Sequence, residues 1–409
     1  MAKRTFRSAA LFILLLAACE SFAKQPVVVI SIDGMDQRYL SDRDKLGLKI
    51  PNLRRLIREG QWSAGVIGVV PTVTWPSHTT MITGLDPTEH GILNNRRPAS
   101  EGGNYYWSVD LLKTTTLLDA AHGAGFKTAT ITWPVTVGAA SDFNLPEYFG
   151  KRQGASMDLR TMSTKANPRD LAERITRMFP SFHQEWVDDR TRILALRYFL
   201  RTEHPDLTLV HLVDLDNEAH ANGPFTPEAI SVLEYQDELI GTALQDLPAN
   251  YAVVVVSDHG FEKIEREVNL GVIADQRGVK GLRPMGGMVV APDAQSYGLL
   301  RDLQKDPKYG IGREIPKDEI RRFAPNLAGA AGVFESAAGV WFPSTNAGEV
   351  FPKQEQLGEH GHWPTRYRAV FLAKGPEIRA ERLPEISMKD IAQRLATLLG
   401  ISFHPSPRQ

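Results

Sequence analysis

The fold follows from a short apolar stretch near the start of the chain, residues 27 to 34, which read VVVISIDG. Its first six residues are small or apolar and rich in β-branched side chains, a pattern typical of a β-strand covered on both faces. Asp33 and Gly34 follow at once, so a carboxylate stands where the strand ends. In open parallel sheets, ligands bind at the carboxyl ends of the strands. The stretch therefore predicts a buried strand whose end is a candidate site.

Similar strands alternate with helix-like segments along the rest of the chain. The further predicted strands are residues 128–132, 207–213, 253–256 and 369–372. The predicted helices are residues 51–59, 116–124, 167–178, 227–244 and 388–399, the last with Ser387 as its N-cap. This alternation predicts an α/β sandwich around a mostly parallel central sheet. Residues 24 to 409 are expected to form a single domain, in which the Gly- and Pro-rich region at about 265–350 is a small, irregular cap or insert.

Acidic and imidazole side chains follow three of the predicted strands. They are Asp33 after the first strand, Asp214, Asp216 and His220 after residues 207–213, and Asp258 and His259 after residues 253–256. A single Asp in such a place is more often a helix cap or a turn residue, so the functional interpretation depends on the three occurring together. A cluster of carboxylates at a desolvated strand end is costly unless a cation is present. Carboxylate and imidazole together suit zinc or manganese.

The spacing of these residues is compatible with metal binding. Asp216 and His220 are four residues apart, so one helical turn aligns them. Asp258 and His259 are adjacent and can reach one ion only on an irregular turn, which the following glycine permits. His360 lies in a glycine-rich segment and is a further candidate, although a lone His there is more often a plain loop residue.

A threonine stands at the start of a predicted helix in residues 70–78, which read VPTVTWPSH. Pro76 suits the first turn of a helix, and Thr74 lies where an N-cap residue would lie. The simplest interpretation of Thr74 is that cap. The same position faces backbone N–H groups and the positive end of the helix dipole, which is a good place for a phosphate. A metal ion can also activate such a hydroxyl as a nucleophile.

Taken in order, these motifs resemble the nucleotide pyrophosphatase/phosphodiesterases of the alkaline phosphatase superfamily. The matching segments, between about residues 26 and 400, are Asp33-Gly34, 71–78, 83–87, 90–92, 133–134, Asp216 with His220, 223–224, 257–260 and 358–361. The resemblance implies an alkaline-phosphatase-like three-layer sandwich. It also implies an enzyme that hydrolyses phosphodiester or pyrophosphate bonds in nucleotides or related organic phosphodiesters.

The resemblance further implies two zinc ions and a covalent phospho-threonine intermediate on Thr74 that water then cleaves. The implied ligands are Asp216, His220 and His360 for one ion, and Asp33, Asp258, His259 and the Thr74 oxygen for the other. Asp214 is the rival of Asp216, but only Asp216 has a His at the matching spacing.

The resemblance assigns the substrate contacts to residues near Thr74. Asn95 falls where the family places an amide that binds a phosphoryl oxygen, with Asn94 as the less suitable substitute. Trp75 falls where relatives place an aromatic ring against a nucleobase. Tyr106 and its aromatic neighbours are candidates for a second stacking face. Packing in the core is the alternative role for all these rings.

Composition narrows the possible functions. The chain has 409 residues, 47 Lys and Arg against 48 Asp and Glu, 11 His and one Cys. Near-neutral charge argues against nucleic-acid binding by bulk charge. One Cys cannot form an internal disulfide or a multi-cysteine zinc site, so His and carboxylates must hold any metal. The alternatives left open are a phosphomonoesterase or a lipid head-group phosphodiesterase on the same two-metal site, and a metal-dependent binding protein without activity.

The first 23 residues have the pattern of a secretory signal. Three basic residues precede an apolar run at 8–18, which is too short to span a bilayer. Residues 21–23 form a small-x-small cleavage site, whereas residues 16–19 resemble a lipobox that would place a lipid on Cys19. We therefore expect export to the periplasm without a transmembrane span, and a soluble form is slightly favoured over a lipoprotein.

Overall fold

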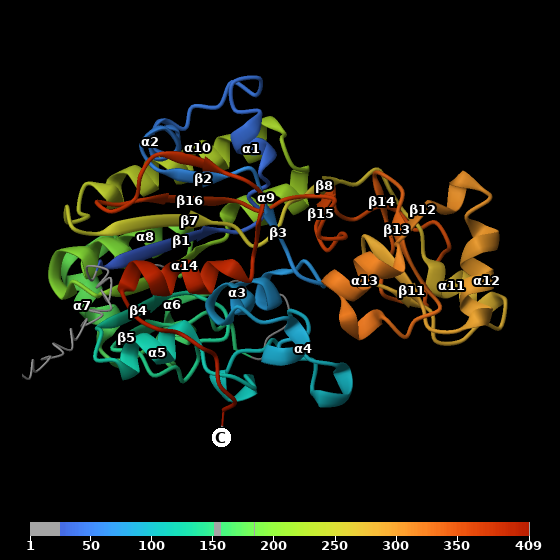
Figure 1. The fold of residues 1–409 in the computed structure, drawn as a ribbon, viewed down its shortest axis with the longest axis horizontal. Helices are drawn as coiled ribbons and strands as arrows, with labels where there is room; N and C mark the ends of the chain where they lie inside the picture. Colours follow the sequence, from blue (N-terminus) through green and yellow to red (C-terminus); the bar gives the residue numbers. More distant parts are fainter. Residues whose placement is uncertain (1–24, 151–156, 184, 409) are drawn as a thin grey trace, which may run out of the picture.

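The computed structural model describes residues 25–150, 157–183 and 185–408, so the expected signal with Cys19 lies outside the described residues. An eight-stranded sheet runs through the main body (Figure 1). Its strands, in spatial order, are β17 (Glu381–Leu383), β2 (Gln61–Ser63), β16 (Phe371–Lys374), β7 (Ala252–Val256), β1 (Val27–Ile32), β6 (Leu207–Leu212), β4 (Thr128–Ile131) and β5 (Phe143–Leu145).

The central part of this sheet is parallel. The five adjacent strands β7, β1, β6, β4 and β5 all run in one direction. β16 pairs antiparallel with both β7 and β2, and β17 is parallel to β2. All six residues of β1 are buried, as expected for the strand at the centre of a covered sheet. The mostly parallel sheet predicted from the sequence is confirmed.

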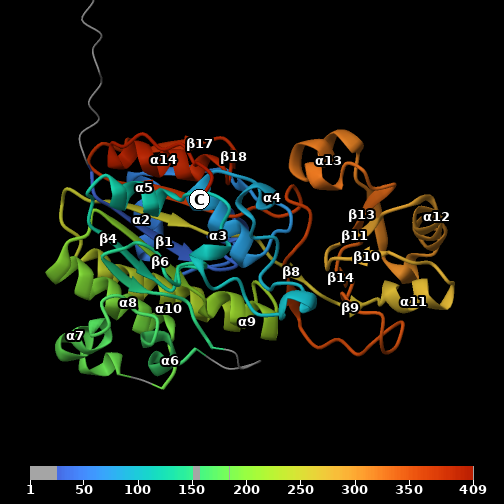
Figure 2. The ribbon, with the colours of Figure 1, turned by 90° about the horizontal axis from the view of Figure 1, so that it is seen from below.

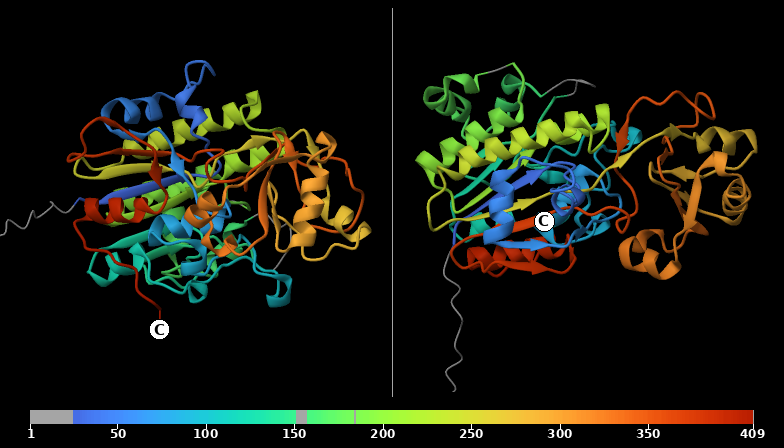
Figure 3. Two further views of the ribbon diagram at one scale, coloured as in Figure 1. Left: turned by 45° about the vertical axis from the view of Figure 1, so that its right-hand side comes forward. Right: turned by 90° about the horizontal axis from the view of Figure 1, so that it is seen from above.

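Helices cover both faces of the sheet and make three layers (Figures 1 and 3). One face carries α2 (Pro51–Glu59), α7 (Leu171–Met178), α8 (Asp189–Tyr198) and α10 (Pro227–Leu244); the other carries α3 (Thr74–Thr83), α5 (Leu117–Gly123) and α14 (Asp390–Leu399). Successive residues of a strand point to opposite faces. Accordingly, Val28 and Ile30 pack with the first group of helices, and Val27 and Val29 pack with the second.

A second, smaller sheet lies beside the main body, within residues 265–350 (Figure 2). Its antiparallel strands are β10 (Arg283–Pro284), β11 (Met288–Ala291), β13 (Gly332–Ser336) and β12 (Ile311–Glu314), packed with α11 (Leu270–Gln276), α12 (Ala294–Leu303) and α13 (Lys317–Phe323). From its sequence, this region is expected to be irregular. Its strands are short and interrupted by Gly and Pro, so they leave little periodic pattern to detect. Its role as a cap within one domain stays a prediction.

Short strand pairs connect the two parts of the chain. They are β8 (Glu262–Lys263) with β15 (Gly358–Glu359), and β9 (Arg266–Glu267) with β14 (Val340–Trp341). A third pair, β3 (Val66–Ile67) with β18 (Ile386–Ser387), lies next to the main sheet. Because Ser387 belongs to β18, the predicted N-cap at Ser387 is wrong, and Lys389 precedes α14 instead. Within the described ranges, no helix combines the length and the apolar character needed to cross a membrane.

Candidate metal centre and active site

The ends of three neighbouring strands bring the predicted ligands together. Asp33 follows β1, α9 (Asp214–Asn222) follows β6, and Asp258 follows β7. The loops are tied by hydrogen bonds, because the Asp33 N–H donates to Leu212 O over 2.8 Å and the Gly34 N–H donates to Asp258 Oδ1 over 3.0 Å. The convergence at one sheet edge that the sequence predicted is therefore present in the fold.

Two overlapping groups of side chains could hold metal ions. The ligand atoms of Asp216, His220 and His360 lie within 4.8 Å of one another, and so do those of Asp33, Asp216 and His259. Asp258 borders the second group, since its Oδ2 lies 3.1 Å from His259 Nε2. Every carboxylate and imidazole predicted as a ligand thus lies in or beside one of these groups.

Asp214, the rival of Asp216, faces a different network. Its Oδ2 accepts a hydrogen bond from the Asp189 N–H over 3.1 Å, and its Oδ1 lies 3.7 Å from Arg192 Nη1. Asp216 and His220 instead lie one turn apart on α9, with His220 Nε2 3.5 Å from Asp216 Oδ2. The helix therefore directs Asp216, and not Asp214, toward His220.

The tautomers of His220 and His360 leave a lone pair on Nε2, the ring nitrogen that lies near Asp216. His220 Nδ1 donates to Gly358 O over 2.9 Å, and His360 Nδ1 donates to Thr72 O over 3.3 Å, so each ring keeps Nε2 as an acceptor. The ring of His259 stacks on that of His360, with centroids 3.7 Å apart. Imidazoles fixed through one nitrogen commonly ligate a metal with the other.

Several ligand atoms in these groups are buried without a hydrogen-bond partner. They are Asp33 Oδ1, Asp216 Oδ1, Asp258 Oδ2 and His259 Nε2. Burying unpartnered polar atoms costs free energy, and most buried polar atoms in proteins are satisfied. A divalent cation that accepts nitrogen and carboxylate ligands would satisfy these atoms together. The donor set therefore fits a metal centre.

The pKa values show that the buried carboxylates at this edge repel one another and that His259 offsets part of their charge. Burial raises the pKa of Asp33 well above its ordinary value, and the nearby Asp258 and Asp216 raise it further. Burial alone would raise the pKa of Asp258, but His259 outweighs it and holds that pKa well below the ordinary range. Burial alone would lower the pKa of His259, yet Asp258 and Asp33 raise it to about 9. Such a field favours a bound cation.

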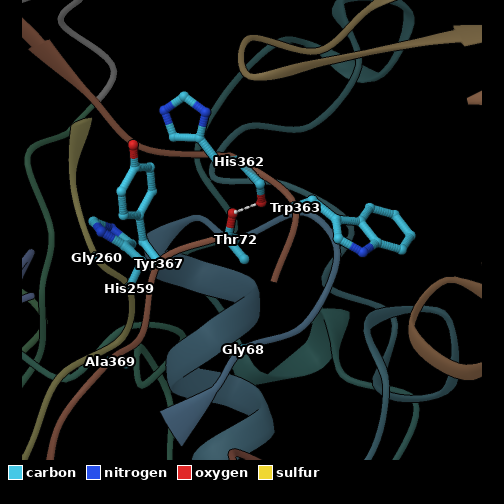
Figure 4. A pocket seen from close by; sticks show the side chains of 8 residues that line it. All are labelled: Gly68, Thr72, His259, Gly260, His362, Trp363, Tyr367 and Ala369. Atoms are coloured by element: carbon cyan, nitrogen blue, oxygen red, sulfur yellow. Dashed lines mark hydrogen bonds between the residues drawn. The ribbon is translucent and has the colours of Figure 1, made fainter. Parts of the chain in front are cut away.

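Beside the metal-binding groups, the chain is packed so closely that Gly260 has no room for a side chain. A Cβ on Gly260 would lie 2.4 Å from Asp36 Oδ2 and 2.7 Å from Tyr367 Cβ. A cavity of about 10 Å³ lies next to Gly260, and Figure 4 shows side chains that line it, among them those of His259, Tyr367 and Thr72. This volume is about the minimum that holds one water molecule.

The segment that carries His360 is fixed to the segment before α3. The Thr72 hydroxyl donates to His362 O over 2.6 Å, the contact drawn in Figure 4. Together with the bond from His360 Nδ1 to Thr72 O, this contact holds His360 beside the chain that leads to Thr74. Residues nearly three hundred positions apart in the sequence thereby border one site.

Thr74 is the first residue of α3, and Val73 is the N-cap, so the predicted cap position is wrong by one residue. Thr74 is buried, and its carbonyl oxygen lies 2.8 Å from His78 Nδ1. The same His78 nitrogen lies 3.7 Å from Asp258 Oδ2. His78 therefore links the start of α3 directly to the metal-binding groups.

Asn95 also lies at the start of α3. Its Oδ1 accepts a hydrogen bond from the Trp75 N–H over 3.0 Å. Asn94 is exposed, and its Oδ1 accepts from the Asn95 N–H instead. The geometry thus brings Asn95, rather than Asn94, next to Thr74.

Trp75 and Tyr106 are both buried, with exposed fractions of 4% and 6%. They share an apolar cluster with Ile92 and other residues. The ring of Tyr105 lies over Trp75 with centroids 4.7 Å apart, and Tyr105 and Trp107 keep some exposed surface. The cluster adjoins Thr74, but contact of Trp75 or Tyr106 with a substrate stays a prediction.

Two buried side chains beside the centre, His211 and Glu147, were not predicted from the sequence. His211, in β6, contacts Asp33 and Glu147 through its two ring nitrogens. A signal for His211 exists in the sequence, because an imidazole interrupts a strand at 207–213 whose other residues, apart from Thr208, are apolar. Glu147 has no such signal, since nothing in its local pattern points to a site.

Comparison with known proteins places this geometry in a family. The sequence profile described as "Type I phosphodiesterase / nucleotide pyrophosphatase" matches residues 27–325. A venom phosphodiesterase of Macrovipera lebetinus is 26% identical over 272 residues, which cover 61% of this chain and 27% of the relative. Human ectonucleotide pyrophosphatase/phosphodiesterase family member 1 is 24% identical over 264 residues, covering 59% of this chain and 24% of the relative. The chain thus spans about a quarter of the length of these curated relatives.

Solved structures share the fold over nearly the whole chain. Human ectonucleotide pyrophosphatase/phosphodiesterase 5 aligns with a TM-score of 0.62 and 19% identity, covering 93% of this chain and 96% of that one. The murine protein, in an inactive variant in complex with AMP, aligns with a TM-score of 0.61 and 19% identity, covering 94% and 98%. These similarities confirm the predicted fold class. From the profile match, the chain belongs to the type I phosphodiesterase / nucleotide pyrophosphatase family.

Proposed function

We propose that the protein is a zinc-dependent hydrolase that cleaves phosphodiester or pyrophosphate bonds of nucleotides or related organic phosphodiesters. The observation that carries this proposal is the convergence of three buried carboxylates and three imidazoles, several with unpartnered ligand atoms, near the start of α3. Family relatives named as phosphodiesterases support it. The murine structural relative described as inactive carries a threonine-to-alanine change, which supports a threonine nucleophile.

Two zinc ions suit the donor set. We assign Asp216, His220 and His360 to one ion, and Asp33, Asp258, His259 and the Thr74 oxygen to the other. The three carboxylates and a Thr74 alkoxide sum to a charge of about −4, which two zinc ions would offset. Zinc would supply Lewis-acid stabilisation of phosphoryl oxygens and lower the pKa of a bound hydroxyl.

Thr74 acts as the nucleophile in this proposal. Its Oγ1 loses the hydroxyl proton to solvent and forms a bond to phosphorus, while the bond from phosphorus to the leaving oxygen breaks and that oxygen takes up a proton. Water then attacks the phospho-threonine, the bond between phosphorus and Oγ1 breaks, and Thr74 regains a proton. The positive end of the α3 dipole lies at Thr74 and stabilises the negative charge on the phosphoryl group.

Asn95 orients the same phosphoryl group. The Trp75 N–H holds its Oδ1, so Nδ2 is free to donate to a phosphoryl oxygen. Trp75 and Tyr106 form the wall behind this position, and the partly exposed ring of Tyr105 extends that wall toward the solvent. We propose that an aromatic or otherwise planar part of the substrate packs there.

We also propose export to the periplasm, on the pattern of the first 23 residues. Mass spectrometry of the mature protein tests this directly. A chain that begins at Lys24 supports a soluble form, whereas a lipid-modified Cys19 supports an anchored form, and an intact Met1 in the mature protein contradicts export.

Hydrolysis of bis-p-nitrophenyl phosphate compared with p-nitrophenyl phosphate tests the reaction class. We expect kcat/KM for the diester to exceed that for the monoester by at least about tenfold, a difference of about 1.4 kcal/mol in transition-state stabilisation. A strong preference for the monoester would refute the diesterase proposal in favour of a phosphomonoesterase. A glycerophosphodiester assayed in parallel distinguishes lipid head groups from nucleotides such as dinucleotides.

A further inference from the structure

A buried histidine connects two carboxylates beneath the candidate metal centre. His211 Nε2 lies 2.9 Å from Asp33 Oδ2, and His211 Nδ1 lies 3.2 Å from Glu147 Oε2. None of the three side chains is more than 3% exposed. Asp33 follows β1, His211 lies within β6, and Glu147 follows β5. The three residues are far apart in the sequence, so the folded sheet brings them together.

The contact with His211 makes the two oxygens of Asp33 unequal. Oδ2 is held by the imidazole, whereas Oδ1 is buried without a hydrogen-bond partner and lies 3.3 Å from His259 Nε2. A carboxylate can otherwise rotate and exchange its oxygens. Here the hydrogen bond fixes which oxygen faces the side chains that we assign to a metal.

The ring of His211 is itself held on several sides. Nδ1 also lies 3.2 Å from the carbonyl oxygen of Thr132. The ring packs against that of His78, with centroids 4.2 Å apart, and His78 Nε2 in turn lies 2.9 Å from Ser31 Oγ. Glu147 completes the set, so the orientation of His211 is determined by contacts on both ring nitrogens and one ring face.

Such an arrangement is costly as a purely structural element. Burying two carboxylates on one imidazole requires desolvation that well-packed apolar residues would avoid. Apart from Thr208, the other residues of β6 are apolar, and the whole strand is buried, so a leucine at position 211 would suit its surroundings. Partners that orient a ligating side chain through a second hydrogen bond are a common feature of metal sites, and their loss weakens metal binding.

We propose that His211 and Glu147 are positioning residues that present Asp33 Oδ1 alone to the metal ion of the Asp33, Asp258 and His259 group. This inference rests on the proposed function, because it requires a metal at that group. His211 holds Asp33, and Glu147 holds His211. Neither residue touches the substrate.

Zinc binding to substituted full-length protein tests the proposal without using turnover. The variants are His211→Leu, Glu147→Met and Glu147→Gln, and affinity is measured by competition with a chromogenic chelator, together with zinc content per chain. We expect His211→Leu and Glu147→Met to lower the affinity for one of the two zinc ions about 10- to 100-fold. The affinity for the other ion should be unchanged. Glu147→Gln should stay within about threefold of the parent protein, since the amide oxygen can still accept from Nδ1–H.

The matched control is His122→Leu. His122, in α5, also pairs with a carboxylate, with Nδ1 3.3 Å from Asp142 Oδ2. The pair is partly exposed, and Asp142 accepts from the N–H of Thr128, the first residue of β4, at the opposite end of the strand from the metal-binding groups. We expect zinc affinity in His122→Leu to equal that of the parent protein. The unfolding temperature of each metal-free variant is measured as well, because a purely structural role would lower that temperature and leave the zinc affinity unchanged.

Each outcome decides one proposal. If His211→Leu binds both zinc ions as tightly as the parent protein, the positioning role is overturned. If His211→Leu does not fold, the same result in Glu147→Met overturns it. Equal weakening in Glu147→Met and Glu147→Gln also contradicts it, since the hydrogen bond is then not the cause. A parent protein that binds no zinc overturns the proposed function itself, which a positioning failure alone would leave intact.

Discussion

At the scale of single residues, the groups that we assign to phosphate binding lie together at the start of α3. Thr74 opens the helix, the Trp75 N–H holds the amide of Asn95, and His78 lies between Thr74 O and Asp258. Because contacts with the backbone of α3 fix the side chains of Asn95 and His78, little reorganisation of these groups is needed when a substrate binds. Preorganisation of this kind is a large contribution to catalysis.

Replacement of the nucleophile separates chemistry from metal binding. In Thr74→Ala we expect kcat for a diester to fall by about 10³-fold or more, because no covalent intermediate can form. Zinc content per chain should stay close to that of the parent protein, since six side chains still hold the ions. Thr74→Ser should recover part of the activity. Full turnover in Thr74→Ala would contradict the assignment of the nucleophile.

The two adjacent asparagines give a second, internally controlled prediction. Asn95→Ala should lower kcat by roughly 10²- to 10³-fold, the usual effect of removing one donor to a charged transition state. Asn94→Ala should have little effect, because Asn94 is exposed and its side chain accepts a hydrogen bond from the backbone N–H of Asn95. Steady-state kinetics of both variants are compared with those of the parent. Similar losses in the two would show that Asn95 has no specific role.

Which residues could be identified from the sequence depended on local signals. Five of the predicted ligands stand just after a buried strand or one helical turn from such a residue, so their neighbours in the chain indicate them. His360 and the Thr74 oxygen were instead assigned as ligands from the family resemblance. His211 and Glu147 are 64 residues apart, and His211 and Asp33 are 178 apart. Their contact arises only from the order of strands in the sheet, which single-residue patterns do not specify.

At the scale of elements, the turns after β1 and β7 determine the geometry of the centre. Gly34 adopts φ of +69°, and a Cβ there would lie 2.8 Å from Phe261 Cε2. Gly260 follows His259 directly and lies against Asp36 and Tyr367. Both turns need glycine because other parts of the chain approach within contact distance of where a side chain would begin.

Two glycines with opposite surroundings make a matched test of this requirement. Gly260→Ala should destabilise the protein by roughly 1–3 kcal/mol, because the added methyl overlaps Asp36 and Tyr367. Gly298→Ala, inside α12 with open space around it, should stabilise the protein by about 0.5–1 kcal/mol through better helix propensity. Chemical denaturation measures both. A neutral Gly260→Ala would show that the turn has room to adjust.

Sequence patterns located the long elements well and the short ones poorly. α2 and α10 agree with the predicted helices at 51–59 and 227–244, because a proline at the first helical position marks each start. α14 begins at Asp390 instead of residue 388, since β18 takes up the preceding residues. The strands of the smaller sheet contain two to five residues, too few for an alternating pattern to be distinguished from a loop.

At the scale of the whole molecule, the buried histidines couple folding to pH. His90 accepts from the Ile92 N–H through Nδ1 and contacts Thr80 Oγ1 through Nε2, so its neutral form satisfies both nitrogens. Burial lowers the pKa of His90 to about 3, below the ordinary value of 6.5. Between these two values the unfolded chain binds more protons than the folded one, so stability falls as the pH falls from about 6.5 toward 3.

A variant that lacks this imidazole isolates the effect. Because His90 stays neutral in the folded state, its contribution should make the free energy of unfolding about 2 kcal/mol lower at pH 5 than at pH 8. His90→Gln should lose that component, so its free energy of unfolding should fall less steeply between pH 8 and 5 than that of the parent. Denaturant unfolding at a series of pH values gives both slopes. Equal slopes would contradict a buried, neutral His90.

The central claim, that two bound zinc ions make this fold a phosphodiesterase, is tested most directly by titrating metal-free protein with zinc. Hydrolysis of bis-p-nitrophenyl phosphate and the zinc bound per chain are measured on the same samples. We predict that turnover is absent without metal, rises with added zinc and saturates at two ions per chain. Turnover by the metal-free protein, or zinc saturation at two ions without diester hydrolysis, would contradict the claim.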